Sequence, residues 1–257
     1  MELAGTGGRR PVRRGDWREI QLDLSSSGMV RGVLEREQPN AVFFCAYDKT
    51  NPAVTVDAAV AAARAAQVSG ARFVFYSTDL VFDGELGGYT EESPVSPVSS
   101  YGEMKVEAEA LVRAEHAGAL VIRTSLLVGS SGDMLRPAYE CETMVSRQPV
   151  QLYRDEWRSP THVDDLAHAS WKLAALEVTG VYHVAGAERL SRVELGRILA
   201  ALFRYKTERI QEVDRPPSRP RDTSLDSRRA TALLGWAPRA LSALAAPAAP
   251  PSATAHA

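Results

Sequence analysis

Short apolar runs alternate with longer helical patterns along the first half of the chain, and this alternation constrains the fold more than any other feature. Three runs have strand length, residues 41–45, 73–76 and 120–122. Helical patterns over residues 52–68 and 100–117 separate them. Strand, helix and strand at this spacing predict a parallel sheet covered by helices on both faces. The expected fold class is therefore α/β, with a doubly wound sheet.

Two helix starts carry a serine followed three residues later by a glutamate, which is a capping pattern. These pairs are Ser100 with Glu103 and Ser191 with Glu194. Gly118 is expected to end the helix that begins at Ser100. Weaker patterns predict strands at residues 20–24 and 181–184 and helices at residues 28–37 and 163–176.

The composition excludes several classes of protein. A net charge of −2 gives no global attraction to nucleic acid or to a membrane surface. No apolar stretch is long enough for a transmembrane helix, and the first residues lack the apolar core of a signal peptide. Cys45 lies in an apolar run and is interpreted as a small buried hydrophobe. A disulfide between Cys45 and Cys141 is possible, but the sequence gives no geometry to support it. A cytoplasmic protein is expected.

Tyr101 and Lys105 are four residues apart on the helix predicted from Ser100, so both side chains lie on one face. An ammonium beside a phenol favours the phenolate and lowers the pKa of the tyrosine. Ser77 and Thr78 directly follow a predicted strand, and ligands of open parallel sheets bind at such strand ends. The spacing alone is a weak motif that many helices contain by chance. The strand end and the capped helix together favour a catalytic group of Thr78, Tyr101 and Lys105.

A longer pattern surrounds this group: STDLVFDG at residues 77–84, YTEE at residues 89–92, Pro97, and YGEMK at residues 101–105. It resembles the core signature of the dTDP-4-dehydrorhamnose reductase family, which belongs to the extended short-chain dehydrogenases/reductases. Weaker matches extend the resemblance from near residue 3 to about residue 237. They are LDL at 22–24, PNAV at 39–42, RTS at 123–125, DEWRSPT at 155–161, DDLA at 164–167, RPRD at 219–222 and LD at 225–226.

The resemblance implies a reductase that uses NADPH or NADH on a nucleotide-linked 4-keto-6-deoxy sugar. Tyr101 would protonate the carbonyl oxygen, Lys105 would hold the ribose and lower the Tyr101 pKa, and Thr78 would hydrogen-bond the carbonyl. It also implies a Rossmann-like domain over residues 1–150 and an interleaved, mixed substrate-side lobe over residues 151–240. Residues 241–257 are rich in Ala and Pro and are expected to form a disordered tail.

Further binding residues follow from the resemblance. Arg9 and Arg10 would lie at the 2′-phosphate of NADPH, although a solvated basic turn explains them equally well. Arg158 would bind a phosphate, and a surface salt bridge to Asp155 or Glu156 is the alternative. The implied cofactor contacts are Arg9, Arg10, Asp23, Leu24, Ala46, Tyr47, Ser77, Tyr101 and Lys105, with Tyr47 also explicable as an ordinary half-buried tyrosine. The implied substrate contacts are Asp79, Arg158 and Thr161.

No metal site is expected, because His162, His168 and His183 lack the spacing that places ligands on one helical face. The expected partner is a small nucleotide sugar, and a homodimer or a regulatory partner is compatible with the sequence.

The N-terminus departs from the family pattern. Dinucleotide-binding folds begin with a strand, a Gly-rich turn and a helix, but only four residues precede the glycines at 5–8. Residues 3–8 are therefore interpreted as the family's second strand and its turn. Loss of the first strand would leave two internal strand edges unpaired or force them together. A true start upstream of Met1 is favoured over a short form that folds differently.

A second function remains open. The chain also resembles the beta regulatory subunit of methionine adenosyltransferase, to which residues 160–163 (PTHV) are similar. A non-catalytic regulatory or binding protein on the same fold is thus the alternative to a reductase. A fragment without a stable fold is a third reading.

Overall fold

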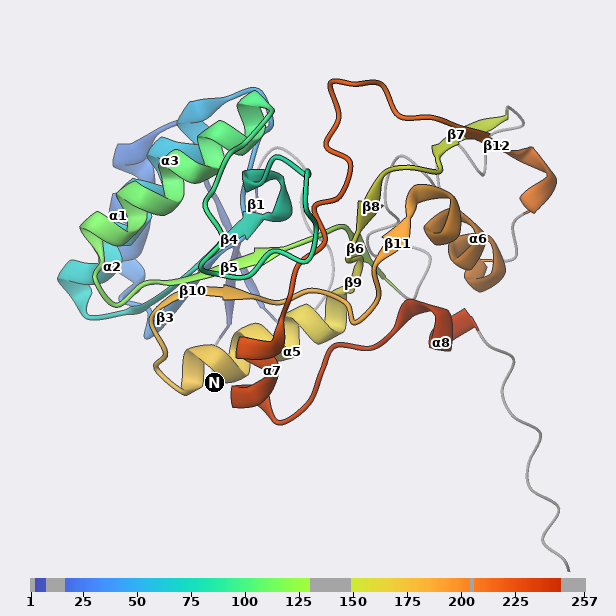
Figure 1. The fold of residues 1–257 in the computed structure, drawn as a ribbon. Coiled ribbons are helices and arrows are strands. Elements are labelled where there is room, and N and C mark those ends of the chain that lie inside the picture. Colours follow the sequence, from blue (N-terminus) through green and yellow to red (C-terminus); the bar gives the residue numbers. More distant parts are fainter. Residues whose placement is uncertain (1–2, 8–16, 130–148, 204–205, 246–257) are drawn as a thin grey trace, which may run out of the picture.

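A four-stranded parallel sheet forms the centre of the computed structural model, which describes residues 3–7, 17–129, 149–203 and 206–245. The strand order is β10-β5-β4-β3, and every neighbouring pair is parallel (Figure 1). The predicted α/β class with a parallel sheet is therefore confirmed. The strands are β3 (Ala41–Phe44), β4 (Arg72–Thr78), β5 (Leu120–Thr124) and β10 (Gly180–His183).

The side chains of β4 show why its sequence is a continuous apolar run. Phe73 and Phe75 lie in the core on one face of the sheet, whereas Val74 and Tyr76 contribute to the core on the other. Successive side chains of a strand point to opposite faces, so a strand covered on both sides is apolar at every position.

Helices cover both faces of the sheet, as the alternating pattern predicted (Figure 1). The face that carries Phe73 is covered by alanine-rich α2, whose small side chains let it approach α1, α3 and the strands closely. The opposite face is covered by α5 and α7. The bounds are α1 (Ser27–Glu37), α2 (Ala58–Ser69), α3 (Ser100–Glu115), α5 (Val163–Ala175) and α7 (Arg228–Leu234).

Several predicted boundaries shift in the structure. The helix predicted over residues 52–68 begins with a π-helical segment, η1 (Ala53–Asp57), before α2. Ser99 rather than Ser100 caps α3, because its side chain accepts the Gly102 N–H, and α3 ends at Glu115, with His116 rather than Gly118 as its C-cap. The capping pair Ser191 and Glu194 is confirmed, since each side chain accepts the other residue's backbone N–H.

The N-terminal strands form a separate sheet. β1 (Ala4–Gly7) pairs in parallel with β2 (Arg18–Gln21), and this pair belongs to a different sheet from β3. Residues 3–8 therefore do contribute a strand, and the strand predicted at 20–24 lies slightly earlier. Within the described ranges no strand pairs with the outer edge of β3.

The second half of the chain builds a lobe with its own apolar clusters beside the sheet. Residues Val128, Leu195, Leu199 and Leu241 form one of these clusters. The prediction that residues 241–257 are disordered is wrong for α8, because Leu241 is buried against α6; the remaining tail lies outside the described residues. The lobe contains β6 (Leu127–Val128), β7 (Val150–Tyr153), β8 (Trp157–Arg158), β9 (Thr161–His162), β11 (Leu190–Ser191), α6 (Arg192–Phe203), η3 (Thr207–Arg209), β12 (Ile210–Val213) and α8 (Leu241–Ala245).

An extended segment, residues 219–226, ties the lobe to the sheet and is called the C-terminal strap. Its backbone bonds β8 through Trp157 and bonds the loop after β4 through Gly84 and Tyr89. The C-terminal strap thus contacts both the lobe and the loop that follows β4.

Four further predictions concern single features. Cys45 is exposed rather than buried, because β3 ends at Phe44 and the thiol lies beyond its last residue. Cys141 lies outside the described residues. None of the helices in the described ranges is long and apolar enough to cross a membrane. Nor do those residues contain a group of three or more His, Cys, Asp or Glu side chains arranged to hold a metal ion.

Candidate active site

Thr78 ends β4 at the carboxyl edge of the sheet, and a single turn, η2 (Asp79–Val81), follows it. Helix α3 begins against this turn because residue 102 is a glycine. A Cβ at Gly102 would lie 2.8 Å from the Cβ of Pro97 and closer still to the carbonyl oxygen of Leu80. The close approach brings the first turn of α3, and with it Tyr101, next to the end of β4.

Tyr101 and Lys105 share one face of α3, as predicted. The Lys105 Nζ lies 6.0 Å from the centre of the Tyr101 ring and 4.6 Å from that of Phe75. It donates a hydrogen bond of 2.8 Å to the carbonyl oxygen of Tyr76. An ammonium has three donors, so two N–H groups remain for a ligand.

Burial lowers the pKa of Lys105 to about 8, whereas the negative charge of Glu109 acts in the opposite direction. Lys105 is only 3% exposed, so desolvation of the ammonium is the larger effect. Glu109 is one turn further along α3 and is itself buried. Its carboxylate accepts the Nε and one Nη of Arg123, at 3.0 and 2.7 Å. Lys105 therefore remains mainly protonated at neutral pH.

The predicted direction of the Tyr101 pKa is wrong for this arrangement. Burial raises the pKa of the phenol, and the nearby Tyr47 and Asp79 raise it further, while Arg158 lowers it. Removal of the phenol from water outweighs the effect expected from Lys105. A tyrosine with a raised pKa is protonated at neutral pH, which is the form that can give a proton to a carbonyl oxygen.

Tyr47 lies beside the face of α3 that carries Tyr101 and Lys105, with its ring centre 5.8 Å from that of Tyr101 and 56% of its surface exposed. Lys49, which the sequence analysis did not single out, places its Nζ 5.9 Å from the Tyr101 ring centre. The Ser77 Oγ is buried and has no hydrogen-bond partner among the described residues. An exposed aromatic ring, spare Lys105 donors and an unsatisfied hydroxyl fit a ligand with hydroxyl groups and a flat ring, as a nicotinamide nucleoside has.

The other predicted cofactor residues fall into three groups. Asp23 is exposed, and its carboxylate accepts the backbone and side chain of Ser25 just before α1. Leu24 and Ala46 pack against the core on the α2 face. Arg9 and Arg10 lie outside the described residues, so no contact of theirs is described.

All three predicted substrate residues are buried by protein contacts. Asp79 and Thr161 are fully buried and Arg158 is 5% exposed. The Thr161 hydroxyl donates to the Ser159 carbonyl and accepts the Gly186 N–H. Arg158 forms a buried ion pair with Asp79 and lies near Glu156, so the salt-bridge alternative for Arg158 holds with buried rather than surface partners. As they stand, these side chains offer no exposed polar edge to a ligand.

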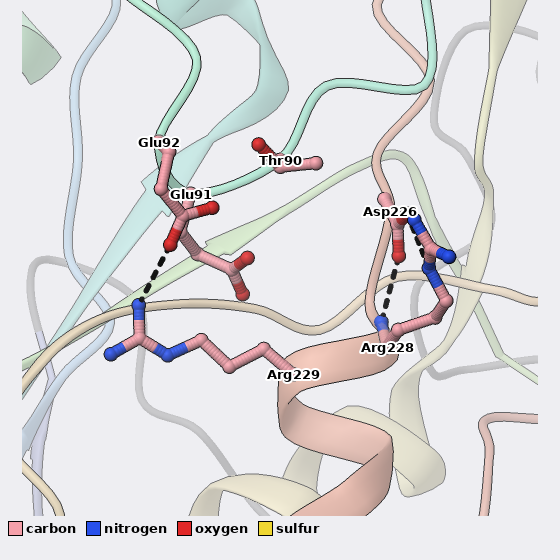
Figure 2. Close-up of a pocket in the computed structure, with 6 residues that line it drawn as sticks. All are labelled: Thr90, Glu91, Glu92, Asp226, Arg228 and Arg229. Carbon is pink, nitrogen blue, oxygen red and sulfur yellow. Dashed lines mark hydrogen bonds and ion pairs between the residues drawn. The ribbon is translucent and has the colours of Figure 1, made fainter.

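Two shallow cavities are separate from these residues, and neither is lined by Thr78, Tyr101 or Lys105. One, of about 460 Å³, lies between the loop after β4 and the start of α7 (Figure 2). Its charges are largely paired, Arg229 with Glu92 and Arg228 with Asp226. Its lining is Thr90, Glu91, Glu92, Asp226, Arg228 and Arg229.

Known proteins similar to this chain include a probable reductase and a subunit of a methionine adenosyltransferase. A probable low-salt glycan biosynthesis reductase of Haloferax volcanii is 30% identical over 164 residues, 60% of this chain and 55% of that protein. Subunit beta of methionine adenosyltransferase 2 from Bos taurus is 27% identical over 231 residues, 81% of this chain and 69% of that subunit. The chain thus spans little more than half the length of the haloarchaeal reductase.

Two examples illustrate the solved structures that share the fold. The dTDP-4-dehydrorhamnose reductase of Bacillus anthracis, in complex with NADP, has a TM-score of 0.78 at 24% identity and covers 90% of this chain, which covers 88% of it. The corresponding Clostridium acetobutylicum protein has a TM-score of 0.79 at 22% identity, with coverages of 95% and 96%. The sequence model of the RmlD substrate binding domain matches residues 6–246. The chain therefore belongs to the RmlD substrate binding domain family, the dTDP-4-dehydrorhamnose reductase-like branch of the short-chain dehydrogenases/reductases.

Proposed function

We propose that this chain is an NAD(P)H-dependent reductase of a nucleotide-linked 4-keto-6-deoxy sugar. One observation carries the proposal: a protonated Tyr101 and a buried Lys105 ammonium share one face of α3 beside the end of β4. Membership of the family supports it, as do related structures determined with NADP, or with UDP-glucose and NAD.

When bound, the cofactor supplies a hydride to the carbonyl carbon of the sugar. Tyr101 gives its phenolic proton to the carbonyl oxygen, so that the carbonyl becomes a hydroxyl group. The Lys105 ammonium stabilises the phenolate that remains, and its two spare donors hold a ribose hydroxyl. Tyr47, Ala46 and Ser77 would line the nicotinamide side of this site.

The preference for NADPH over NADH is part of the proposal. It rests on Arg9 and Arg10, whose guanidinium groups would pair with a 2′-phosphate. Replacing both by alanine should weaken NADPH binding while leaving NADH binding nearly unchanged. Unchanged binding of both cofactors would assign the two arginines to a solvated turn.

A regulatory role is the second candidate, favoured by the likeness to subunit beta of methionine adenosyltransferase 2 over 81% of the chain. On this proposal the chain binds a partner protein and the Tyr101 face performs no turnover. The two functions differ in one measurable respect, the oxidation of NADPH in the presence of a keto sugar.

The test begins with a fluorescence titration of the purified chain with NADPH, followed by a turnover assay with a dTDP-linked 4-keto-6-deoxy sugar. The reductase should bind saturably and oxidise NADPH. Tyr101→Phe should lower kcat by about 10²- to 10⁴-fold with little change in NADPH affinity. Tyr153→Phe is the matched control, because Tyr153 lies in β7 of the lobe and retains its ring against Arg219.

Each outcome separates the candidates. Full activity in Tyr101→Phe would refute the mechanism. Saturable NADPH binding without turnover of any keto sugar would favour the regulatory role. Failure to bind NADPH in a chain that melts cooperatively would reject the reductase for this chain.

A further inference from the structure

The loop between β3 and η1, residues 45–52, lies at the carboxyl edge of the sheet and is called the β3 loop. Its centre is tied to η1 by Thr55, which is fully buried. The Thr55 hydroxyl accepts the Asp48 backbone N–H at 2.8 Å and donates to the Asp48 carbonyl oxygen at 2.6 Å. One buried side chain therefore holds both backbone groups of Asp48.

Further hydrogen bonds keep the shape of the β3 loop. The Asp48 carboxylate accepts the backbone N–H and the hydroxyl of Thr50, both at 2.9 Å. The Asn51 side chain accepts the Ala53 N–H at 3.0 Å, where η1 begins. Short polar side chains that bond the nearby backbone in this way stabilise one loop conformation. The backbone on either side of Asp48 is thus fixed relative to η1.

The two residues that flank Asp48 both approach Tyr101. The ring centre of Tyr47 is 5.8 Å from that of Tyr101, and the Lys49 Nζ lies 5.9 Å from the Tyr101 ring centre. The Lys105 Nζ is 6.0 Å from the same ring centre. Tyr101 therefore has two ammonium groups beside it, one from α3 and one from the β3 loop.

The charge of the Lys49 ammonium is not balanced by the protein. Lys49 is exposed, and its ammonium forms no ion pair with a carboxylate of the described residues. The neighbouring Asp48 carboxylate bonds Thr50 instead, and Glu109 is paired with Arg123. The excess positive charge beside Tyr101 favours an anionic ligand.

The ligands of the proposed function supply such an anion as phosphate. A nucleotide sugar and a nicotinamide dinucleotide each carry a diphosphate, and a lysine ammonium binds phosphate as a compact charge with three donors. Arg158, the phosphate partner expected from the sequence, is 5% exposed and already paired with Asp79. Lys49 is exposed and can take the role for which Arg158 is not available.

We propose that Lys49 binds a phosphate group of the ligand that lies against Tyr101, and that Thr55 is a positioning residue that holds Lys49 there through the backbone of Asp48. This rests on the proposed reductase function, whose substrate and cofactor both carry such a group. It adds to the site a cation that the sequence pattern did not indicate.

Calorimetric titrations of the full chain with NADPH and, separately, with dTDP measure phosphate binding without turnover. Lys49→Gln should raise the Kd of at least one of them by about 10-fold, because a charge-assisted hydrogen bond is lost. A rise confined to dTDP assigns the phosphate to the sugar nucleotide, and a rise confined to NADPH assigns it to the cofactor. The affected Kd should also depend less on NaCl concentration in Lys49→Gln than in the wild type.

Two controls accompany Lys49→Gln. Lys49→Arg keeps the cation, so its Kd should stay within about threefold of the wild-type value. Lys206→Gln removes the charge of an exposed lysine in the lobe and should leave both Kd values unchanged.

The role of Thr55 is tested by two substitutions of different chemistry. Thr55→Val removes the hydroxyl at nearly equal volume and should raise the same Kd by about threefold or more, because both backbone groups of Asp48 lose their partner. Thr55→Ser keeps the hydroxyl and should bind as the wild type does. If Thr55→Val melted at a lower temperature but bound both ligands normally, the hydroxyl would act on the fold alone and the positioning role would be wrong.

These outcomes differ from those that test the proposed function. A wild type that binds NADPH and dTDP but reduces no keto sugar rejects the reductase, while the comparison with Lys49→Gln still decides the phosphate contact. Equal Kd values for the wild type and Lys49→Gln with both ligands at low salt reject the role of Lys49 and leave the reductase standing. A wild type that binds neither ligand rejects both proposals. Lys49→Gln changes an exposed side chain, so it remains decisive if Thr55→Val fails to fold.

Discussion

The ammonium of Lys105 donates a hydrogen bond to the backbone carbonyl oxygen of Tyr76, 2.8 Å away in β4. This bond holds the charge at the sheet edge, where burial lowers its pKa to about 8. The ammonium is therefore lost as the pH rises through about 8, and NADPH affinity should fall with it. Titrations with NADPH from about pH 6.5 to about pH 9.5 would measure the effect.

Lys105→Met is the control for this pH dependence. It should bind NADPH weakly at every pH and show a flat profile in the same range. If wild-type affinity did not change up to the top of that range, the ammonium would not be a cofactor contact.

Glu109 is expected to keep Lys105 charged. Glu109→Gln removes the carboxylate that raises the Lys105 pKa and leaves Arg123 as a second buried cation. The Lys105 pKa should fall further, so loss of NADPH affinity should begin about one pH unit or more below its wild-type position.

Glu107→Gln is a matched control, because Glu107 is on the same helix but exposed. It should keep the wild-type pH profile. If Glu109→Gln also kept that profile, Glu109 would act only on the fold, through Arg123.

The sequence was sufficient to predict the elements that depend on local patterns. Tyr101 and Lys105 lie on one helix face because the spacing of four dictates it, and Ser191 with Glu194 caps α6 because the pair is local. The parallel sheet follows from the alternation of apolar runs with helices.

Features that depend on distant partners could not be predicted in this way. Asp79 meets Arg158 79 residues away and Thr223 144 residues away, so its burial has no local signal. The predicted lowering of the Tyr101 pKa was wrong for the same reason. Burial of the phenol by the fold raises its pKa, and this outweighs the effect expected from Lys105 on the same helix. The helix at residues 241–245 forms because Leu241 is buried against the lobe, which overrides the Ala- and Pro-rich composition.

Gly87 should be intolerant of a side chain, because the C-terminal strap lies against it. A Cβ there would lie 2.7 Å from the Asp222 Oδ1 and closer still to the Oδ2. Asp222 also holds Arg189 through an ion pair, so Gly87→Ala should displace the strap and lower the free energy of unfolding by about 3 kcal/mol or more. Urea denaturation measures the change.

Gly88→Ala is the control for backbone strain. Both glycines have a positive φ, but a Cβ at Gly88 meets nothing within 4 Å. Its expected effect is the strain alone, about 1 to 2 kcal/mol. Equal losses of unfolding free energy in Gly87→Ala and Gly88→Ala would show that Asp222 can move aside without a measurable cost.

His183 should make the fold sensitive to acid. Its side chain is fully buried, its Nδ1 bonds the carbonyl oxygen of Tyr89 at 3.0 Å, and its Nε2 has no partner among the described residues. Burial, with the nearby Arg123, lowers its pKa from 6.5 to about 4. Between these values the unfolded chain binds more protons than the folded chain, so stability falls as the pH drops below 6.5 and the loss ends near pH 4.

The expected loss from this one group is at most about 3 kcal/mol across that window, at about 1.4 kcal/mol per pKa unit. His183→Asn keeps a side-chain N–H for Tyr89 but cannot be protonated, so its unfolding free energy should fall less steeply with acid than that of the wild type. His168→Asn changes an exposed histidine on α5 and should keep the wild-type slope. Urea titrations at several acidic pH values compare the unfolding free energies of the three proteins. If all three fell equally steeply with pH, protonation of His183 in the folded chain would cost no stability.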